Sequence, residues 1–492
     1  MTLKEIISGI NIVSVNGDTS TDISLVCNDS RKVIPGALFV AVEGFASDGH
    51  DFICTAVEKG ACAVIYENEE KARVALEDAG KEGICLIQVK SSRNALALAA
   101  SAFFDNPSHK LTLVGITGTN GKTTTATLLY RMFTRLGYNC GLLSTIANYV
   151  GDRGSEAVNT TSDPITINSL LNEMVEAGCE YCFMEVSSIG VEQERISGLK
   201  FKVGIFSNLT HDHLDYHKTF AEYLRCKKLF FDNLPKDAYA ITNIDDRNGM
   251  VMMQNTKAKV VTYSLRSIAD HTCRIIEQSF EGMLLRMDSR ESWTPLIGQH
   301  NAYNLLALYS TAMVLGAEEE EALIALSTLK PAPGRLENMR GPKDISVIID
   351  YAHTPDALEN VLKTLREIAP ERELICLFGC GGDRDRSKRP EMAKVAQKLA
   401  DRIIVTSDNS RSEKTEDIMN EIKSGMDLSG KARSLFIADR EQAIRTAIML
   451  AGQGATILLA GKGHETYQIT GKEKRHFDEK EIVSGIFNEM NI

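Results

Sequence analysis

The sequence lacks an excess of basic residues, and this absence excludes one broad class of partner. Its 55 Lys and Arg residues are outnumbered by 66 Asp and Glu residues, giving a formal net charge of −11. A protein that binds a nucleic acid without sequence preference needs cations to displace the counterions of the phosphate backbone. We therefore expect no nucleic-acid partner, although a local cluster of cations can still bind a small anionic ligand.

The sequence also has no long hydrophobic run. One of its more apolar runs, ALALAASAFF at 95–104, is far shorter than the roughly 20 residues that a helix needs to cross a bilayer. The first residues, MTLKEIISGINIVSV, include Lys4 and Glu5 and lack the apolar core of a secretory signal. We expect no membrane-spanning segment and no membrane partner.

The sequence also lacks a complete cysteine motif for a zinc site. The 11 cysteines are scattered, mostly in apolar segments such as GICLIQV and LICLFGC. This usage is typical of a reducing compartment, so we expect a cytoplasmic protein whose thiols pack as small hydrophobic groups. Cys179 and Cys182 form a lone CxxC, without the second pair that a zinc site requires.

What the sequence does contain is a long alternation of apolar strands and helical segments in three blocks. Its 492 residues suffice for two to four domains. The blocks are 1–107, 108–335 and 336–492, and the Pro- and Gly-rich stretch KPAPGRLE at 330–337 is interpreted as a hinge. Apolar strands separated by helices predict parallel sheets with right-handed crossovers.

The strongest single motif is VGITGTNGKTTTATLL, a strand that runs through a glycine-rich turn into a helix. Glycines let backbone N–H groups surround phosphate oxygens at a helix N-terminus. Lys122 would reach the terminal phosphates of a nucleotide, and the Thr123 hydroxyl would bind Mg²⁺. The usual first glycine is replaced by Ile116, so we expect Gly115 and Gly118 to share the turn-forming role.

This loop predicts a nucleotide site, because a chance Gly-Lys-Thr-Thr at a strand–helix junction is rare. By itself the loop does not separate a kinase, GTPase, motor or ligase. The residues expected to contact the phosphates are Gly118, Thr119, Asn120, Gly121, Lys122, Thr123 and Thr124.

Three residues downstream are candidates for metal chemistry. Glu185 ends the strand of FMEVSS, where a carboxylate can contact Mg²⁺ directly or through water. His213, in SNLTHDHLDYH, is an alternative ligand, but a histidine bonded to Asp215 in a loop is an equally good interpretation. Lys227, in YLRCKKLFF, would by default be a surface lysine with its stem on apolar neighbours.

The stretch SDNSRSE at 407–413 lies between an expected strand, DRIIVTS, and an expected helix, TEDIMNEIKSGM. Such loops carry ligand contacts in α/β proteins. The alternative is a helix capped by Asp408 or Ser410, with a solvated Arg411 beside it.

Taken together, these motifs resemble the Mur ligases, the ATP-dependent amide-forming enzymes of peptidoglycan synthesis. The similarity covers the whole chain and is most specific for the MurE type, which adds the third residue of the stem peptide. The stretches that carry it are DSRKVIPGALFVAVEGFASDGHDFI, GITGTNGKTTT, NTTSDP, MEVSS, SNLTHDHLDYH, LIGQHNAYNLLA, PAPGRLE, DYAHTPDALE, FGCGGDRDRSKRP and LAGKGHETYQ.

The resemblance implies an α/β fold of three domains. These are a smaller N-terminal α/β domain at 1–107 for the uridine diphosphate substrate, a central P-loop ATPase domain at 108–335 with a mostly parallel sheet, and a C-terminal Rossmann-like domain at 336–492 for the amino acid. It also implies ATP and Mg²⁺ as cofactors, UDP-MurNAc-L-Ala-D-Glu and a diamino acid as substrates, and a monomer.

Site residues follow from the resemblance position by position. The uridine diphosphate end of the substrate would contact Ser30 and its neighbours Asp29 and Arg31. The muramoyl dipeptide would contact Asn159, Thr160, Thr161, Ser187, Gln193 and Arg195. Additional ATP contacts would come from Asn301, Asn304, Arg335, Asp350 and His353. The pocket for the amino acid would comprise Arg384, Asp408, Asn409, Arg411, Gly461 and Glu465.

The implied catalytic residues are Lys122, Glu185, His213 and Lys227. The implied metal ligands are Thr123, Glu185, His213 and Lys227, the last as a carbamate. Carbamylation turns the lysine from a cation into an anion, which explains a lysine beside a metal.

Two positions depart from the family pattern. The histidine that the family commonly has after EVSS is Ile189 here, and the role of this position stays open. The Asp-Asn-Pro-Arg loop has Ser410 in place of proline, so its backbone is not locked by a ring. A looser loop leaves L-lysine or another diamino acid open as the substrate.

Arg411 is expected to bind the far carboxylate of meso-diaminopimelate. Lysine has only an ammonium at that end, which an arginine would repel. Asp408 and Glu465 would then be free to bind the ammonium beside that carboxylate.

The implied reaction has two steps. The substrate carboxylate attacks the γ-phosphate of ATP to give an acyl phosphate, and the amine of the amino acid then displaces phosphate. Two alternatives stay open: another ligase of this fold, such as one that adds glutamate to folate, and a non-catalytic nucleotide-binding paralogue. The first would not need DSRKVIPGALFVAVEG or FGCGGDRDRSKRP, and the second is disfavoured by an intact set of catalytic residues.

Overall fold

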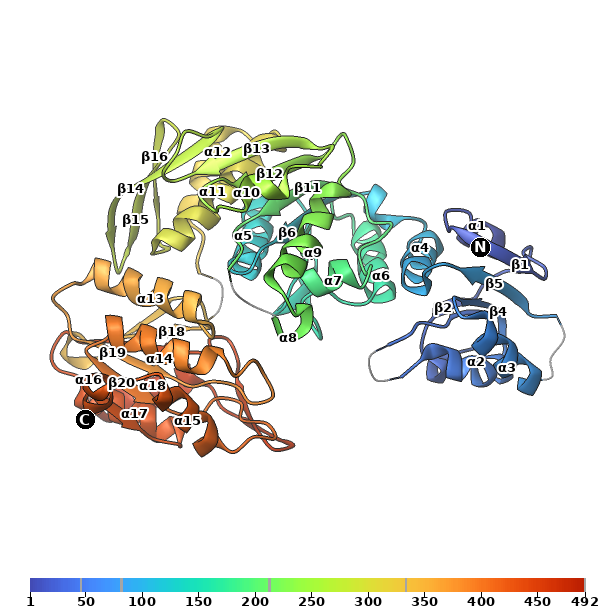
Figure 1. The fold of residues 1–492 in the computed structure, drawn as a ribbon. Coiled ribbons are helices and arrows are strands. Elements are labelled where there is room, and N and C mark those ends of the chain that lie inside the picture. The colour runs from blue at the N-terminus through green and yellow to red at the C-terminus, as the bar shows by residue number, and fades with distance from the viewer. Residues whose placement is uncertain (45–46, 80–82, 211–213, 332–333, 491–492) are drawn as a thin grey trace.

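The computed structural model describes residues 1–44, 47–79, 83–210, 214–331 and 334–490. Its strands form three main sheets and one separate hairpin. In Figure 1 the part that carries the largest sheet lies between an N-terminal block, coloured blue, and a C-terminal block, coloured orange to red.

The N-terminal sheet has the strand order β1-β5-β4-β3-β2. Its strands are β1 (Ile12–Asn16), β2 (Leu25–Cys27), β3 (Ala37–Val40), β4 (Ala61–Tyr66) and β5 (Cys85–Val89). The helices are α1 (Leu3–Ile6), η1 (Ser30–Lys32), η2 (Gly49–Phe52), α2 (Ile53–Glu58), α3 (Glu69–Ala79), α4 (Ser92–Phe103) and η3 (Pro107–His109). Helices α1 and α4 pack into one apolar cluster with this sheet, and α2 and α3 into another.

The central sheet has eleven strands in the order β16-β15-β14-β13-β12-β11-β6-β10-β7-β8-β9. They are β6 (Thr112–Thr117), β7 (Cys140–Leu143), β8 (Ala147–Val150), β9 (Arg153–Glu156), β10 (Tyr181–Glu185), β11 (Phe201–Phe206), β12 (Tyr239–Asn243), β13 (Lys259–Ser264), β14 (His271–Ser279), β15 (Gly282–Met287) and β16 (Arg290–Thr294). Strand β6, which leads into the glycine-rich loop, lies between β10 and β11 in the parallel part of the sheet.

Helices cover the central sheet in two apolar clusters. The helices of this region are α5 (Lys122–Arg135), α6 (Pro164–Glu176), α7 (Ser188–Glu192), α8 (Leu214–His217), α9 (Phe220–Asp232), α10 (Gly249–Met252), α11 (Gln299–Val314) and α12 (Glu319–Ser327). Helices α5, α11 and α12 contribute to one cluster, and α6, α9 and α10 to the other.

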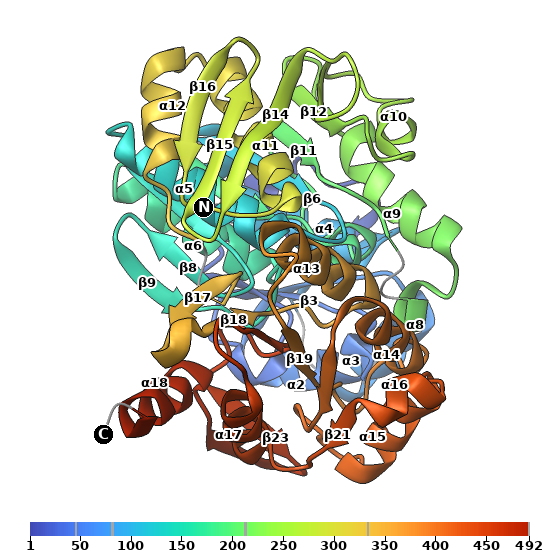
Figure 2. The same ribbon diagram turned by 90° about the vertical axis from the view of Figure 1, so that its left-hand side faces the viewer.

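The C-terminal sheet has the order β17-β18-β22-β19-β20-β21, with β23-β24 as the separate hairpin. The strands are β17 (Glu337–Arg340), β18 (Ser346–Asp350), β19 (Leu374–Phe378), β20 (Arg402–Val405), β21 (Ser434–Phe436), β22 (Thr456–Ala460), β23 (Tyr467–Thr470) and β24 (Glu473–His476). The helices are η4 (Pro342–Asp344), α13 (Pro355–Ile368), α14 (Lys388–Leu399), α15 (Thr415–Ser424), α16 (Leu428–Ala432), α17 (Arg440–Leu450) and α18 (Glu479–Met490). Figure 2 shows α13 at the upper edge of this block, facing the central part.

The predicted α/β architecture with mostly parallel sheets is confirmed, but the edges of the sheets differ from the prediction. Strands β14, β15 and β16 form an antiparallel meander at one edge of the central sheet, and β7, β8 and β9 form another at the opposite edge. Short connections join these strands, and a short connection permits only antiparallel pairing. Strands β1 and β17 are also antiparallel to their neighbours.

The predicted domain limits at 107 and 335 each fall between two sheets, and they stay a prediction. Of the helices in the described ranges, none is both long enough and apolar enough to span a bilayer.

Candidate active site

Two glycines with positive φ form the turn of the glycine-rich loop. Strand β6 ends at Thr117, Gly118 and Gly121 have φ values of +152° and +89°, and α5 begins at Lys122. A Cβ on Gly118 would lie 2.0 Å from Ser207 Oγ, and one on Gly121 would lie 2.6 Å from Asn304 Oδ1. Neither position therefore accepts a side chain without displacing a neighbour.

The expectation that Gly115 shares the turn is wrong. Gly115 lies inside β6, where a Cβ would lie 2.6 Å from the ring of Phe230 and 2.8 Å from that of Phe201. This glycine makes room for two packed aromatic rings.

Two lysines converge on one carbonyl of this loop. Lys122 Nζ donates to Gly118 O at 2.9 Å and to Thr119 O at 2.9 Å, and Lys227 Nζ donates to the same Gly118 oxygen at 2.8 Å. Lys227 is only 1% exposed and lies 4.8 Å from the ring centre of Tyr223, so the alternative of a surface lysine is wrong. The tertiary fold brings both cations to the place where a phosphate would bind.

Oxygen atoms suited to Mg²⁺ lie beside this pair of lysines. The Thr123 hydroxyl donates to Glu185 Oε2 at 3.0 Å, and the Thr145 amide donates to Glu185 Oε1 at 2.8 Å. Mg²⁺ prefers one or two protein oxygens together with substrate phosphates, and this donor set fits that preference. Lys227 would join it only as a carbamate, because an ammonium has no lone pair to offer.

The remaining metal prediction cannot be placed, since His213 lies outside the described residues. Among the described residues, no group of three or more His, Cys, Asp or Glu side chains forms a closed metal site. Cys179 and Cys182 are buried free thiols.

A cavity of about 360 Å³ opens where the loop faces the C-terminal block. The residues with predicted ATP contacts that line it are Asn120, Gly121, Thr124, Asn301, Asn304, Arg335 and Asp350. Arg335 Nε is buried without a hydrogen-bond partner among the described residues, so the cavity holds an unmatched donor of the kind that an anion satisfies. His353 does not line this cavity, and its Nδ1 lies 2.9 Å from Tyr351 O.

Several cavity residues were not predicted from the sequence. Tyr303 donates from its hydroxyl to Asp245 Oδ2 at 2.9 Å, and both line the cavity. Asn120 Nδ2 donates to Asp356 Oδ2 at 2.8 Å, which joins the loop to the first turn of α13. These contacts depend on residues more than 50 positions apart, so no local pattern indicates them.

Most residues predicted for the dipeptide do come together. The Thr161 hydroxyl donates to Glu185 O at 2.9 Å and accepts from the Ser187 amide at 3.0 Å. Arg195 donates to Gln193 Oε1 at 2.7 Å and to Thr161 O at 2.5 Å. Their network adjoins the Thr123–Glu185 pair, so a substrate held here would end close to the phosphate loop.

The other positions discussed for the nucleotide substrate differ in their contacts. Thr160 accepts a hydrogen bond from Thr145 Oγ1 at 3.0 Å, whereas Asn159 is exposed. Ser30 lies in η1 of the N-terminal block, beside an exposed Arg31 paired with Asp29. Ile189 lies half-buried in α7, and its contacts assign it no chemical role.

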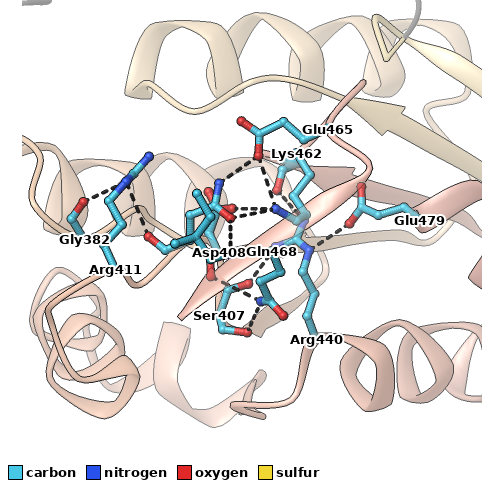
Figure 3. A network of polar contacts seen from close by, with 12 residues as sticks. Gly382, Ser407, Asp408, Arg411, Arg440, Lys462, Glu465, Gln468 and Glu479 are labelled. Carbon is cyan, nitrogen blue, oxygen red and sulfur yellow. Dashed lines mark hydrogen bonds and ion pairs between the residues drawn. The ribbon is translucent and has the colours of Figure 1, made fainter. Parts of the chain in front are cut away.

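The second polar cluster lies at the carboxyl ends of β20 and β22, and Figure 3 shows it. The Lys462 ammonium donates to Asp408 Oδ1 at 3.4 Å, Asn409 Oδ1 at 3.2 Å and Glu465 Oε2 at 3.2 Å. Asn409 Nδ2 donates to Glu465 Oε2 at 2.8 Å. Sequence reasoning missed Lys462, and the expectation that Asp408 and Glu465 are free is wrong, because this lysine joins them.

The two carboxyl groups respond differently to burial. Burial raises the pKa of Glu465, and the charge of Lys462 only partly opposes it. Burial also acts to raise the pKa of Asp408, but the charges of Lys462 and Arg440 outweigh it and hold that pKa below its usual value. Arg440 is fully buried beneath the cluster and donates to Ala460 O and Ser407 O.

Arg411 presents one edge of its guanidinium group to a ligand. Its Nη1 donates to Gly382 O at 2.8 Å and to Asn409 O at 3.4 Å, while Nε and Nη2 have no partner among the described residues. These two N–H groups form the fork that binds a carboxylate with two hydrogen bonds. The residue has a φ of +50°, an uncommon conformation for a non-glycine residue.

The helix-cap alternative for this loop is wrong. Helix α15 begins at Thr415 after Lys414, which makes no side-chain cap, and neither Asp408 nor Ser410 reaches it.

Gly461 has a φ of +114°, and a Cβ there would lie 3.5 Å from Asp408 Oδ2. Arg384 is exposed, without a hydrogen bond or ion pair among the described residues, so the structure does not bring it into the cluster.

Three family models match successive parts of the chain. They are the Mur ligase family, catalytic domain at 22–104, the Mur ligase middle domain at 116–312, and the Mur ligase, glutamate ligase domain at 334–463. The chain belongs to the Mur ligase family. The resemblance inferred from the motifs is thereby confirmed.

Full-length relatives narrow the position of this Mur ligase within its family. The chain is 51% identical over 489 residues to the UDP-N-acetylmuramoyl-L-alanyl-D-glutamate--2,6-diaminopimelate ligase of Bacteroides fragilis, covering 99% of both chains. The enzyme of the same name from Clostridioides difficile is 42% identical, with 100% of both chains covered. A solved structure of a ligase of that name is 30% identical, has a TM-score of 0.72, and covers 100% of this chain and 99% of its own.

Solved structures with lower identity show only the shared fold. A folylpolyglutamate synthase of Mycobacterium tuberculosis complexed with ADP and AMPPCP is 18% identical, covers 75% of this Mur ligase and 92% of its own chain, and has a TM-score of 0.61. The folate-type alternative therefore matches a smaller part of the chain and at lower identity.

Proposed function

We propose that this Mur ligase joins meso-diaminopimelate to the D-glutamate of UDP-MurNAc-L-Ala-D-Glu, at the expense of ATP. The observation that carries the proposal is the full-length identity of 51% to a relative named for that reaction. The two lysines on the phosphate loop support the use of ATP, and the fork of Arg411 supports an amino acid with a carboxylate at its far end.

The reaction begins with the transfer of a phosphoryl group. A carboxylate oxygen of D-glutamate attacks the γ-phosphorus of ATP, the bond to the bridging oxygen breaks, and ADP leaves. The amine of the incoming amino acid then attacks the acyl carbon of the acyl phosphate, and phosphate departs with the former carboxylate oxygen. The amine loses a proton in this step.

The chain's own residues serve this chemistry by balancing charge and excluding water. Lys122, already turned toward the loop carbonyls, would move to the terminal phosphates, and Arg335 would offer its unmatched Nε–H. Thr123 and Glu185 would hold Mg²⁺ with a carbamylated Lys227, and the bound ion would neutralise charge on the phosphates. Closure of the C-terminal block onto the central part would shield the acyl phosphate from hydrolysis, although the predicted hinge at 330–337 lies partly outside the described residues.

The remaining parts of the proposal concern the substrate's other end and the location. The uridine diphosphate group would bind in the N-terminal block near Ser30, and the dipeptide near Thr161 and Arg195. None of the 11 cysteines, all of which lie in the described ranges, forms a disulfide, and this usage of a reducing compartment supports a cytoplasmic location. We propose that the enzyme acts as a monomer.

Ligation itself tests the proposal. With UDP-MurNAc-L-Ala-D-Glu, meso-diaminopimelate, ATP and Mg²⁺, we expect a product whose mass has grown by one diaminopimelate residue, as read by mass spectrometry. If the protein binds ATP but forms no product, the non-catalytic alternative is correct. If product forms only with L-lysine, the choice of amino acid is wrong.

Arg411→Ala is expected to reduce the preference for meso-diaminopimelate over L-lysine by about 10- to 100-fold in kcat/KM. Loss of a charged hydrogen-bond partner costs about 1.5–3 kcal/mol, and the far carboxylate would lose its fork. Arg411→Lys keeps the charge but removes the fork, so it should recover only part of the preference. Arg445→Ala, at an exposed ion pair with Glu489, is the control. A ratio that is unchanged in Arg411→Ala contradicts this role.

A further inference from the structure

Lys462 is a buried cation that the reaction scheme leaves without a role. It is 0% exposed, in a cluster whose other members are residues predicted to bind the amino acid (Figure 3). We propose that Lys462 is a selectivity residue that sets the charge of this cluster, so that it accepts an ammonium only together with a neighbouring carboxylate. This inference rests on the proposed function and adds a determinant of its substrate class.

Lys462 is fixed in place by its hydrogen bonds. An ammonium has three N–H groups, and Asp408, Asn409 and Glu465 each accept from Lys462 Nζ at 3.2–3.4 Å. The rings of Tyr467 and Phe477 lie 5.8 Å and 6.0 Å from this nitrogen. All three N–H groups of Lys462 are therefore used, and none remains to bind a carboxylate of the ligand. The lysine can act on the ligand only through its charge and through the residues that it orients.

The groups it holds still offer an acceptor. Asn409 is oriented from both ends, because its Oδ1 also accepts from the Ile469 amide at 2.9 Å and its Nδ2 donates to Glu465. Both bonds to Glu465 use Oε2, while Oε1 has no hydrogen-bond donor within the described ranges of the chain. A ligand ammonium can therefore bind Glu465 Oε1 without displacing Lys462.

The charge count then favours one kind of ligand. Asp408 and Glu465 as carboxylates carry two negative charges, and Lys462 reduces the net charge of the cluster to −1. The buried Arg440 beneath the cluster adds no net charge, because it is paired with Glu479 at 2.8 Å. Arg411, on the same loop as Asp408, adds a positive charge with an open fork. The far end of meso-diaminopimelate carries one ammonium, which matches the negative cluster, and one carboxylate, which matches Arg411. The far end of L-lysine carries only an ammonium and leaves Arg411 unpaired.

Removing the charge of Lys462 would favour binding of L-lysine more than binding of meso-diaminopimelate. A lone ammonium would meet two negative charges in place of one, so its attraction to the cluster would grow. The far end of meso-diaminopimelate would gain the same attraction at its ammonium. Part of this gain would be cancelled, because its carboxylate would be repelled by the added negative charge.

The test compares kcat and KM for L-lysine and meso-diaminopimelate in the wild-type enzyme and in Lys462→Met, which keeps length without charge. We expect the ratio of kcat/KM to shift toward L-lysine by about tenfold, mainly through a lower KM for L-lysine. Lys462→Gln is a second neutral variant, in case methionine is not tolerated. Lys472→Met, at an exposed lysine in the turn between β23 and β24, should leave the ratio unchanged.

Each outcome decides the matter. A ratio that is unchanged in a folded neutral variant overturns the role of Lys462, and so does an equal loss of activity with both amino acids. If thermal denaturation shows that neither neutral variant is folded, Lys462 is structural and the inference is also overturned. A wild-type enzyme that ligates neither amino acid refutes the proposed function instead.

Discussion

Lys227→Ala should lose at least about a hundredfold in kcat while retaining its fold. With the carbamate that we propose, the wild-type residue would be a ligand of Mg²⁺ that the variant lacks. In the structure two ammonium groups donate to one carbonyl oxygen, that of Gly118, so their nitrogens lie within about 6 Å of each other. At an effective dielectric constant of about 20, such a like-charge pair costs roughly 3 kcal/mol. Converting Lys227 to a carbamate would replace this repulsion by attraction to Lys122.

The measurement has two parts. Activity of Lys227→Ala should be partly restored by added bicarbonate or short carboxylic acids, which can replace the missing anion. Independently of activity, ¹³C-labelled bicarbonate should give the wild-type protein a carbamate carbon signal in NMR that Lys227→Ala lacks. Lys228→Ala, at the next position of α9, is the matched control. Full activity in Lys227→Ala, or the same carbamate signal in both proteins, would show that Lys227 is not the modified residue.

Lys122→Ala is expected to lower kcat/KM for ATP by about a hundred- to a thousandfold. The lysine is half-buried at the first position of α5 and donates to two carbonyls of its own loop, Gly118 O and Thr119 O. Alanine is a good helix former and also relieves the repulsion with Lys227, so the unliganded protein should melt within a few degrees of wild type.

The control for this variant is Lys110→Ala, an exposed lysine that precedes β6. ATP should raise the melting temperature of the control as much as that of wild type. It should raise the melting temperature of Lys122→Ala clearly less. If Lys122→Ala melts far below wild type without any ligand, the loop lysine is structural. If the variant ligates at the wild-type rate, the phosphate role is wrong.

Local patterns predicted the elements that depend on neighbours in sequence. The strand before the phosphate loop, the helix that starts at Lys122 and the strand that ends at Glu185 all follow from apolar runs, glycines and spacing. The antiparallel meander of β14 to β16 was not predicted. The direction of pairing depends on the length of the connection between two strands, and the sequence analysis did not recognise these strands.

Contacts between distant segments account for the rest. The sequence left Lys227 undecided between a surface and a site residue, because its burial depends on packing against a loop 109 positions away. Lys462 was missed because a lysine is exposed by default. A signal was present nonetheless: two carboxylates had been assigned to one pocket, and a buried pair of like charges requires a cation.

Release of inorganic phosphate from ATP tests the central claim most directly. We predict release only when UDP-MurNAc-L-Ala-D-Glu and meso-diaminopimelate are both present with Mg²⁺, in equal amount to the amide product, and far slower release when L-lysine replaces meso-diaminopimelate. Phosphate release that does not depend on the amino acid, or no release with all components present, would contradict the assignment of this chain as a diaminopimelate-adding ligase.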